Sequence, residues 1–181
     1  MRLPARMRRS SLLPLAELMS PPYNVLFLCT GNSSRSILAE AILRHRGEPN
    51  FWAFSAGSHP AGYLNPYALR QLEAAGLSIN GLRSKSWDEF AKPGAAVMNF
   101  VFTLCDSAAQ EACPVWPGPP VTAHWGLQDP GNTPGSSADV EQAFRDTFLT
   151  LDRRIGLFLS LPLASLSALA VKKELDEIGR K

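Results

Sequence analysis

The chain has 181 residues, of which 45% are hydrophobic and 19% charged, with a formal net charge of +2. This length is typical of one compact domain, and the composition excludes disordered, collagen-like and coiled-coil proteins. Four arginines and one glutamate lie within residues 1–22, so that segment carries +3 and the remainder −1. A protein with so little net charge lacks the basic surface that binds nucleic-acid phosphates, and we expect no nucleic-acid partner.

Residues 1–22 are predicted to be a disordered N-terminal extension. Arg8 and Arg9 give it some likeness to a twin-arginine export signal, but a proline and a glutamate interrupt the apolar stretch that follows. We favour an extension ahead of an alternative start at Met19. No apolar run reaches the roughly 20 residues that a membrane-spanning helix needs, so we expect no membrane association.

The chain contains three cysteines, Cys29, Cys105 and Cys113. An odd number of cysteines without a convincing secretory signal is typical of thiols in a reducing compartment, so we expect a cytoplasmic protein. The cysteine and histidine spacings match no zinc pattern. There is also no flavin or nicotinamide motif, and we expect no tightly bound cofactor.

Predicted strands and helices alternate along the chain. Short apolar runs predict strands at 24–28, 51–55, 99–104 and 121–125. Helix formers at helical spacing predict helices at 36–47, 65–75, 138–161 and 165–178. This alternation predicts an α/β three-layer sandwich with a four-stranded parallel sheet and helices on both faces. We expect a single domain over residues 23–181, with an extra C-terminal helix from about residue 165.

The loop from Cys29 to Ser36 lies between the first predicted strand and the first predicted helix. It has the form Cys-x5-Arg, in which backbone N–H groups and the positive end of the next helix can hold a phosphate-like oxyanion. Gly31 permits the necessary backbone conformations, and the planar guanidinium of Arg35 can clamp two oxygens. The same field should lower the pKa of Cys29 and make it a thiolate nucleophile. The predicted oxyanion-binding residues are Thr30, Gly31, Asn32, Ser33, Ser34, Arg35 and Ser36.

The alternative for this loop is that Cys29 is a buried apolar residue ending a strand and Arg35 a surface residue. Cys-x5-Arg alone is common by chance, but its place between a strand and a helix favours the catalytic interpretation. In open parallel sheets, ligands bind outside the carboxyl ends of the strands. Cys29, Cys105 and the loop after Trp125 all follow predicted strands, so we expect them at one rim of the sheet.

The loop and its context resemble the low-molecular-weight protein tyrosine phosphatase family over about residues 24–161. Three further segments resemble the thioredoxin-coupled arsenate reductases of that superfamily: Thr103-Leu104-Cys105, Ala112-Cys113-Pro114 and His124-Trp125-Gly126-Leu127-Gln128-Asp129-Pro130. The resemblance implies that Asp129 is the general acid, although an aspartate before a proline is also a common turn former. Tyrosine phosphatases of this fold usually carry tyrosine after Asp-Pro. This chain has Gly131 and Asn132 there, which argues against phosphotyrosine.

The resemblance also implies a relay of three thiols. Cys29 attacks arsenate, Cys105 attacks Cys29 and releases arsenite, and Cys113 attacks Cys105. The resulting disulfide passes to thioredoxin or a similar dithiol protein, which supplies the two electrons that the reduction needs. Because a disulfide requires α carbons within about 7 Å, the small-residue segment 106–112 must reshape. Free cysteines are often simply buried, so core thiols remain the alternative for Cys105 and Cys113.

Asn32, Glu40 and Ser55 match positions that hold a potassium ion in some relatives, which makes potassium a candidate cofactor beside the loop. Glu40 as a solvated helix residue is an equally good interpretation. Arg83, Lys85, Arg153 and Arg154 are predicted to be ordinary surface charges. Trp125 is predicted to be a core residue, and its neighbour His124 is assigned no chemical role.

The sequence therefore predicts an arsenate reductase, and two other functions remain open. A phosphatase acting on phosphotyrosine or a small phosphomonoester would use Cys29, Arg35 and Asp129 and leave the other cysteines idle. A thiol-based redox or arsenic-binding module would hold trivalent arsenic without turnover. Such a module needs neither the clamp of Arg35 nor the acid of Asp129, and their presence argues against it.

Overall fold

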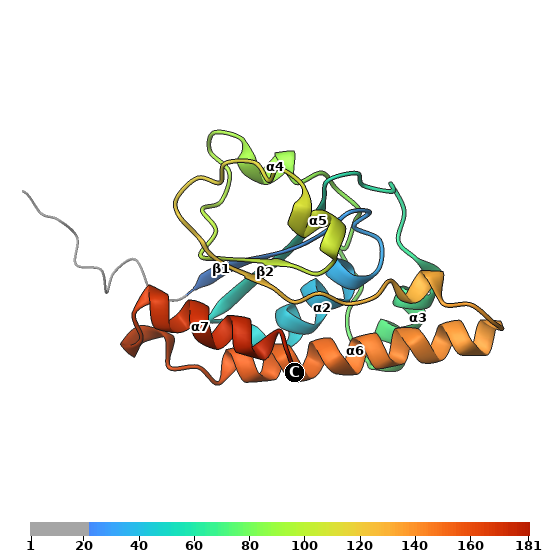
Figure 1. Cartoon of the computed structure of the whole chain (residues 1–181). Coiled ribbons are helices and arrows are strands. Elements are labelled where there is room, and N and C mark those ends of the chain that lie inside the picture. Colours follow the sequence, from blue (N-terminus) through green and yellow to red (C-terminus); the bar gives the residue numbers. More distant parts are fainter. Residues whose placement is uncertain (1–21) are drawn as a thin grey trace, which may run out of the picture.

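The computed structural model describes residues 22–181 as a parallel sheet with helices on both faces (Figure 1). The extension predicted over residues 1–22 lies, except for Pro22, outside the described residues. The strands are β1 (Tyr23–Cys29), β2 (Phe51–Gly57), β3 (Phe100–Thr103) and β4 (Val121–His124). The α-helices are α2 (Arg35–Gly47), α3 (Pro66–Ala74), α4 (Asp88–Ala91), α5 (Asp106–Gln110), α6 (Ser137–Leu159) and α7 (Ala168–Ile178). Two short 3-10 helices, η1 (Pro130–Asn132) and η2 (Leu163–Ser165), complete the elements.

All four strands run parallel in the order β2-β1-β3-β4. The chain moves from β1 to β2 on one side and then crosses to β3 on the other, so the strand order switches direction between β1 and β3. Cys29 ends β1, and Cys105 lies two residues after the end of β3. A switch point of this kind is where open α/β sheets bind ligands. The predicted α/β three-layer sandwich with four parallel strands is confirmed.

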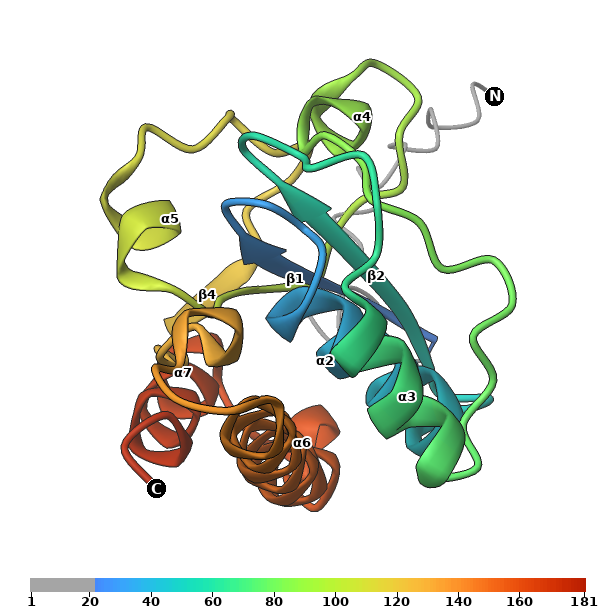
Figure 2. The same ribbon diagram turned by 90° about the vertical axis from the view of Figure 1, so that its right-hand side faces the viewer.

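The alternating side chains of β1 enter two separate cores. Val25 and Phe27 belong to a large core, whereas Leu26 and Leu28 belong to a smaller one. Successive side chains of a strand point to opposite faces, so a strand covered on both faces is apolar throughout. Figure 2 shows α2, α3, α6 and α7 on one side of the sheet and the short helices α4 and α5 on the other.

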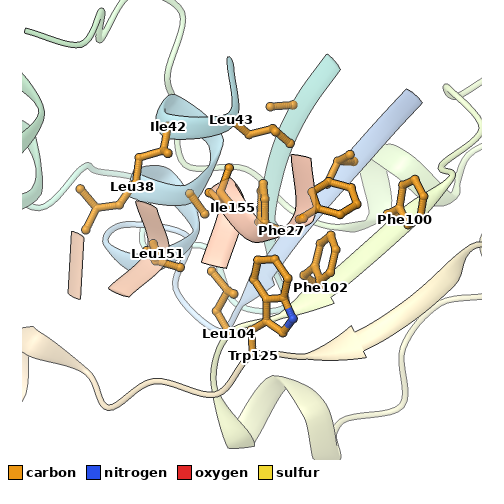
Figure 3. Packing of buried hydrophobic residues seen from close by; sticks show 14 of the residues in the cluster. Phe27, Leu38, Ile42, Leu43, Phe100, Phe102, Leu104, Trp125, Leu151 and Ile155 are labelled. Atoms are coloured by element: carbon orange, nitrogen blue, oxygen red, sulfur yellow. The ribbon is translucent and has the colours of Figure 1, made fainter. Parts of the chain in front are cut away.

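The large core is built around stacked aromatic rings under α2 and α6. Figure 3 shows Phe27, Phe100, Phe102 and Trp125 packed together against the aliphatic side chains of these helices. The rings of Phe102 and Trp125 have centroids 4.2 Å apart. Burial of such large apolar surfaces dominates the stability of the fold and fixes where β1, β3 and α2 meet.

The C-terminal helix α7 covers the edge strand β4. Val171, Leu175 and Ile178 belong to the same large core as β1 and β3. Trp125 donates a hydrogen bond from Nε1 to the carbonyl of Leu175 at 2.9 Å, and Lys172 Nζ donates to the carbonyl of Thr122 at 3.0 Å. None of the described helices has the length and apolar character to cross a membrane.

Two helices, α4 and α5, were not predicted, because four and five residues are too few to show a readable periodicity. Phe90 of α4 packs with Trp87 in the smaller core and covers the face of β1 that carries Leu26. The predicted C-terminal helix begins later than expected, since the residues after Pro162 form η2 and α7 starts only at Ala168.

Candidate active site

Cys29 is a buried thiol held at the start of the loop that joins β1 to α2. Its Sγ lies 2.9 Å from Oγ of Ser36, on the first turn of α2. The backbone N–H groups of Ser36 and Asn32 are also directed at the sulfur. The loop thus surrounds the thiol with hydrogen-bond donors, which is an arrangement that favours a thiolate.

Burial nevertheless raises the pKa of the Cys29 thiol above its usual value. The Ser36 hydroxyl, the Ser36 N–H, the charge of Arg35 and the Asn32 N–H all lower this pKa, in that order, without overcoming burial. The prediction of a lowered pKa is therefore wrong in direction. The physical reason is that the sulfur is almost completely removed from water, and desolvation disfavours its charged form.

Asn32 gives the loop its shape through an unusual backbone conformation. Its φ is +45°, a left-handed value that is uncommon for a residue with a side chain. Asn32 Nδ2 donates to the hydroxyls of Ser36 and Ser55, both at 2.9 Å, and Oδ1 accepts from the N–H of Lys85 at 2.8 Å. The sequence assigned the special backbone conformation to Gly31, which is not among the residues of positive φ.

Gly57, at the end of β2, allows the loop to lie against the sheet. A Cβ atom on this residue would be 2.4 Å from the carbonyl oxygen of Thr30 and 3.0 Å from Cβ of Asn32. No side chain fits there, so this glycine is needed for the close approach of the two backbones. Gly57 could not be recognised from the sequence, because the contact joins segments far apart in the chain.

A cleft of about 530 Å³ opens in front of the loop. Its walls include five of the predicted oxyanion-binding residues, Thr30, Gly31, Ser33, Ser34 and Arg35. The remaining two, Asn32 and Ser36, have 0% exposed surface and lie behind the loop. Their side chains hold the Cys29 sulfur and the loop by hydrogen bonds and do not face the cleft.

Arg35 and Asp129 meet across this cleft. Arg35 Nη2 lies 3.0 Å from Oδ2 of Asp129, and Nη1 donates to the carbonyl of Leu127 at 2.8 Å. Asp129 Oδ1 accepts from the N–H of Gly131 at 3.0 Å, which fixes the carboxylate at the start of η1. Arg35 Nε is buried and has no hydrogen-bond partner among the described residues. Such an unpaired buried donor at the edge of a cleft is ready to bind an oxyanion.

Cys105 reaches the same cleft from the end of β3. Its Sγ lies 3.5 Å from Oγ1 of Thr30 and accepts a hydrogen bond from the N–H of Ala108 at 3.5 Å. Cys29, Cys105 and Ala108 form a small buried cluster. The structure therefore brings the first two predicted relay cysteines together with Arg35 and Asp129 at one rim, as the sequence predicted.

Cys113 is not brought into the cleft. It is an exposed free thiol on the loop that follows α5. Partial desolvation, followed by the nearby Glu111 carboxylate, raises its pKa. The alternative that Cys113 is a core thiol is wrong, whereas Cys105 is buried in a small cluster with Cys29 and Ala108, outside the large core.

His124 has polar partners on both sides, although the sequence assigned it no role. Its Nδ1 lies 2.8 Å from Oγ1 of Thr103, and its Nε2 lies 3.0 Å from Oδ1 of Asp106. Asp106 is the first residue of α5 and directly follows Cys105. A Cβ on Gly126 would meet His124 Nε2 at 2.6 Å, so this glycine leaves room for the contact. The pair ties β4 to the segment that carries Cys105.

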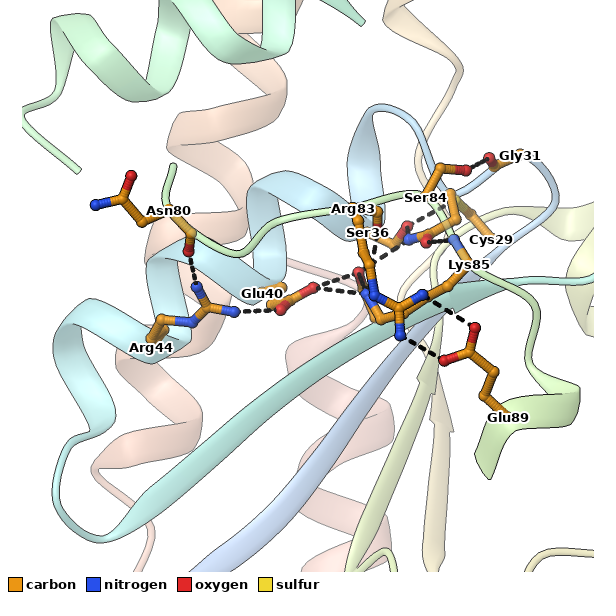
Figure 4. Close-up of polar contacts among 12 residues, drawn as sticks. Cys29, Gly31, Ser36, Glu40, Arg44, Asn80, Arg83, Ser84, Lys85 and Glu89 are labelled. Carbon is orange, nitrogen blue, oxygen red and sulfur yellow. Dashed lines mark hydrogen bonds and ion pairs between the residues drawn. The ribbon is translucent and has the colours of Figure 1, made fainter. Parts of the chain in front are cut away.

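Glu40 and Lys85 form a buried charged network behind the loop (Figure 4). Lys85 Nζ lies 3.4 Å from Oε2 of Glu40 and 3.4 Å from Oγ of Ser55. Arg44 forms an ion pair with the other oxygen of Glu40. The predictions of Glu40 as a solvated residue and of Lys85 and Arg154 as surface charges are wrong, since only 3%, 8% and 6% of their surfaces are exposed.

No sequence signal distinguished Lys85 from the truly exposed Arg83 two residues earlier. Arg83 pairs with Glu89 at the surface, as expected for a solvated charge. Burial of Lys85 depends on Gly57, whose N–H donates to the Lys85 carbonyl at 2.9 Å and holds this segment against the end of β2. In the described part of the chain, no group of three or more histidine, cysteine, aspartate or glutamate residues could hold a metal ion.

Comparisons with known proteins agree with this geometry. The family model described as low molecular weight phosphotyrosine protein phosphatase matches residues 24–174. An arsenate reductase from Shouchella clausii is 33% identical over 134 residues, which cover 74% of this chain and 93% of that protein. A thioredoxin-dependent arsenate reductase from Corynebacterium glutamicum is 26% identical, with a TM-score of 0.52 over 78% of this chain and 67% of the other.

A further solved structure, of an arsenate reductase in a phosphate-binding state, is 24% identical and has a TM-score of 0.58. The match covers 76% of this chain and 97% of the other, and it supports the fold. The family model extends beyond the predicted limit of the resemblance near residue 161 and includes part of α7. The chain therefore belongs to the low molecular weight phosphotyrosine protein phosphatase family.

Proposed function

We propose that this protein reduces arsenate to arsenite, with electrons that pass through its cysteines from thioredoxin. The observation that carries the proposal is the position of Cys105, which lines the same cleft as Cys29 and lies 3.5 Å from Thr30. A phosphatase needs only one thiol in its cleft. A reductase that takes electrons from thiols needs a second thiol that forms a disulfide with the first. The similarity to the arsenate reductase from Shouchella clausii, which covers 74% of this chain, supports the proposal.

The first step joins arsenate to Cys29. Arg35 releases Asp129 and binds two arsenate oxygens through Nε and Nη2, while the N–H groups of the loop and the positive end of α2 bind the others. The Cys29 thiolate attacks arsenic, an As–O bond breaks, and Asp129 donates the proton that lets the oxygen leave as water. No electrons have yet moved to arsenic, which is still pentavalent in the thiolate adduct.

The second step is the reduction itself. The Cys105 thiolate attacks Sγ of Cys29, the S–As bond breaks, and its electron pair stays on arsenic, which leaves as trivalent arsenite. The products are arsenite and a Cys29–Cys105 disulfide, so two thiols have supplied two electrons. Both sulfurs are buried in one cluster with Ala108, which favours this exchange over loss of the adduct to water.

The third step requires the segment around α5 to move. Cys113 is exposed on the loop after α5, outside the cleft, and its thiolate must reach Sγ of Cys105 to release Cys29. α5 has only five residues, and apart from Ala108 its side chains are exposed. Little packing energy opposes its unwinding, and the resulting Cys105–Cys113 disulfide lies where a dithiol protein can reach it.

The partners follow from this scheme. The oxyanion is arsenate, with phosphate as the competing ligand of the same shape, and the reductant is thioredoxin or a similar dithiol protein. Three free thiols fit the reducing conditions of the cytoplasm, where we place the protein. Potassium beside the loop remains a prediction of the family resemblance, and the position of Lys85 bears directly on it.

The test is arsenate-dependent oxidation of NADPH in the presence of thioredoxin and thioredoxin reductase. We expect turnover by the wild type and none by Cys29→Ser, Cys105→Ser or Cys113→Ser. Hydrolysis of p-nitrophenyl phosphate by the same variants is the matched control, because it needs only Cys29 of the three thiols. A wild type that hydrolyses this ester but does not turn over arsenate would be a phosphatase, and the proposal would be wrong.

A further inference from the structure

We propose that the ammonium group of Lys85 is a built-in cation that takes the place of potassium and holds the oxyanion loop in its active shape. The loop would then need no monovalent metal ion. The inference rests on the proposed function only where arsenate turnover is measured. The alkylation rate of Cys29 tests the inference without arsenate. It concerns Lys85 as a positioning residue, because this side chain lies behind the loop and does not line the cleft.

The contacts of Lys85 use the whole hydrogen-bonding capacity of an ammonium group. Nζ has three acceptors, namely Oε2 of Glu40 at 3.4 Å, Oγ of Ser55 at 3.4 Å and the carbonyl of Arg83 at 3.1 Å. An ammonium carries three N–H donors, so each has a partner. The positive charge thus lies beside Glu40, at the place where the family resemblance predicts potassium.

The oxygens that would coordinate potassium are already engaged by hydrogen-bond donors. Asn32 Oδ1 accepts from the backbone N–H of Lys85, and Ser55 Oγ accepts from Asn32 Nδ2 while donating to Glu40. The second oxygen of Glu40 accepts from Arg44. A potassium ion would displace these donors and lie next to an ammonium of like charge, which is strongly unfavourable in a buried site. The residues present therefore do not fit potassium.

A continuous chain of hydrogen bonds connects Lys85 to the reactive thiol. Ser55, which contacts Lys85, accepts a hydrogen bond from Asn32 Nδ2 at 2.9 Å, and the same Nδ2 donates to Ser36 Oγ at 2.9 Å. Ser36 in turn lies 2.9 Å from the sulfur of Cys29. Asn32 holds a left-handed φ that costs energy and persists only when its surroundings enforce it. Lys85 stabilises this conformation of Asn32 in two ways. Its backbone N–H binds Asn32 Oδ1, and its charge fixes Glu40 and Ser55.

Solvent can reach this network through a cleft that shares no lining residue with the active-site cleft. This second cleft of about 370 Å³ is lined by Glu40, Arg44 and Lys85, among other residues. If the Lys85 side chain is shortened, this cleft becomes an entry path for a small cation. Glu40 would remain as a buried carboxylate with one fewer partner, which is a strong attraction for potassium or ammonium.

The experiment uses the Cys105→Ser/Cys113→Ser double variant, in which Cys29 is the only thiol, and measures its alkylation rate by iodoacetamide. Potassium replaces tetramethylammonium at constant ionic strength. We expect a rate that does not depend on potassium. Lys85→Ala should lower the rate about tenfold without potassium, as expected for loss of a hydrogen bond to a charged group. Potassium or ammonium should restore most of that loss, and Lys92→Met, at an exposed lysine, is the matched control.

Three outcomes would overturn the proposal. The first is a protein with Lys85 intact whose Cys29 reactivity requires potassium, and this measurement needs no variant at position 85. The second is unchanged reactivity of Lys85→Ala without potassium. The third is a Lys85→Ala protein that stays slow at every potassium concentration, because Lys85 would then have only a structural role. If arsenate turnover fails while potassium rescues alkylation, the proposed function is wrong and the role of Lys85 stands.

Discussion

The loop at residues 29–36 and the segment at residues 105–113 carry the two parts of the proposed chemistry, and they are built in opposite ways. The loop is held from behind, because Asn32 and Ser36 have no exposed surface and are bonded to β2 and α2. The segment has one short helix and an exposed thiol, Cys113. Binding an oxyanion needs preorganised donors, whereas passing a disulfide between cysteines needs motion. The proposed mechanism therefore assigns oxyanion binding to the firmly held loop and disulfide exchange to the weakly packed segment.

The largest effect is expected from loss of the planar clamp in the rigid loop. Arg35→Lys keeps a positive charge but cannot bind two oxygens with parallel N–H groups, so kcat/KM for arsenate should fall about 100- to 1,000-fold. Turnover is followed by arsenate-dependent NADPH oxidation. The control is Arg83→Lys, an exposed arginine whose partner is Glu89. Near-normal turnover by Arg35→Lys would mean that arsenate reduction does not require a planar guanidinium.

The rigidity of the loop is tested next by two glycine substitutions. Gly57→Ala places a Cβ 2.4 Å from the Thr30 carbonyl, and this overpacking should lower the free energy of unfolding by about 1–3 kcal/mol. Gly31→Ala is the matched control, because its Cβ would meet no atom closer than 3.6 Å. Urea denaturation measures both. Equal losses of stability would show that the approach of β2 to the loop is not specific.

The donors around Cys29 are tested by the pH dependence of its alkylation in the Cys105→Ser/Cys113→Ser background. Because burial raises the pKa of this thiol, the rate should increase with pH to a midpoint above that of an ordinary cysteine. Ser36→Ala removes the largest opposing effect, so the midpoint should move to higher pH and the rate at neutral pH should fall several-fold. Ser34→Ala is the control in the same loop. A midpoint that moves to lower pH in Ser36→Ala would contradict the assignment of its hydroxyl as a donor.

The smallest effect is expected from a substitution in the segment at residues 105–113. Asp106→Asn weakens the contact with His124 and removes the acidic residue from the first turn of α5. Both changes favour opening, so a Cys29→Ser protein treated with diamide should form the Cys105–Cys113 disulfide up to about threefold faster, as for loss of one exposed hydrogen bond. Asp146→Asn, on α6, is the control. A slower reaction would indicate that the His124 contact promotes the motion and does not restrain it.

The strand, loop and helix around Cys29 could be predicted because their signals are local. An apolar run followed by glycine, asparagine and serine and then by helix formers is read within about 25 residues of sequence. Cys105 and Asp129 could be placed at the same rim because parallel strands share one carboxyl edge. The fold and most of the cleft follow from these two arguments.

The support behind the loop could not be predicted, because it depends on contacts between distant segments. Lys85 and Arg83 look alike in the sequence, and only the packing of residues 83–85 against the end of β2 buries one and exposes the other. The need for glycine at position 57 arises from a backbone that approaches it from another segment. The direction of the Cys29 pKa also depends on burial depth, which local sequence does not determine.

The central claim is that the two differently built regions exchange a disulfide after arsenate is reduced. The most direct measurement is mass spectrometry of the unreduced protein, digested after a single turnover with arsenate and no thioredoxin. We predict one arsenite released per chain and a Cys105–Cys113 disulfide in the wild type, with a Cys29–Cys105 disulfide in Cys113→Ser. Three free thiols after incubation with arsenate would contradict this mechanism.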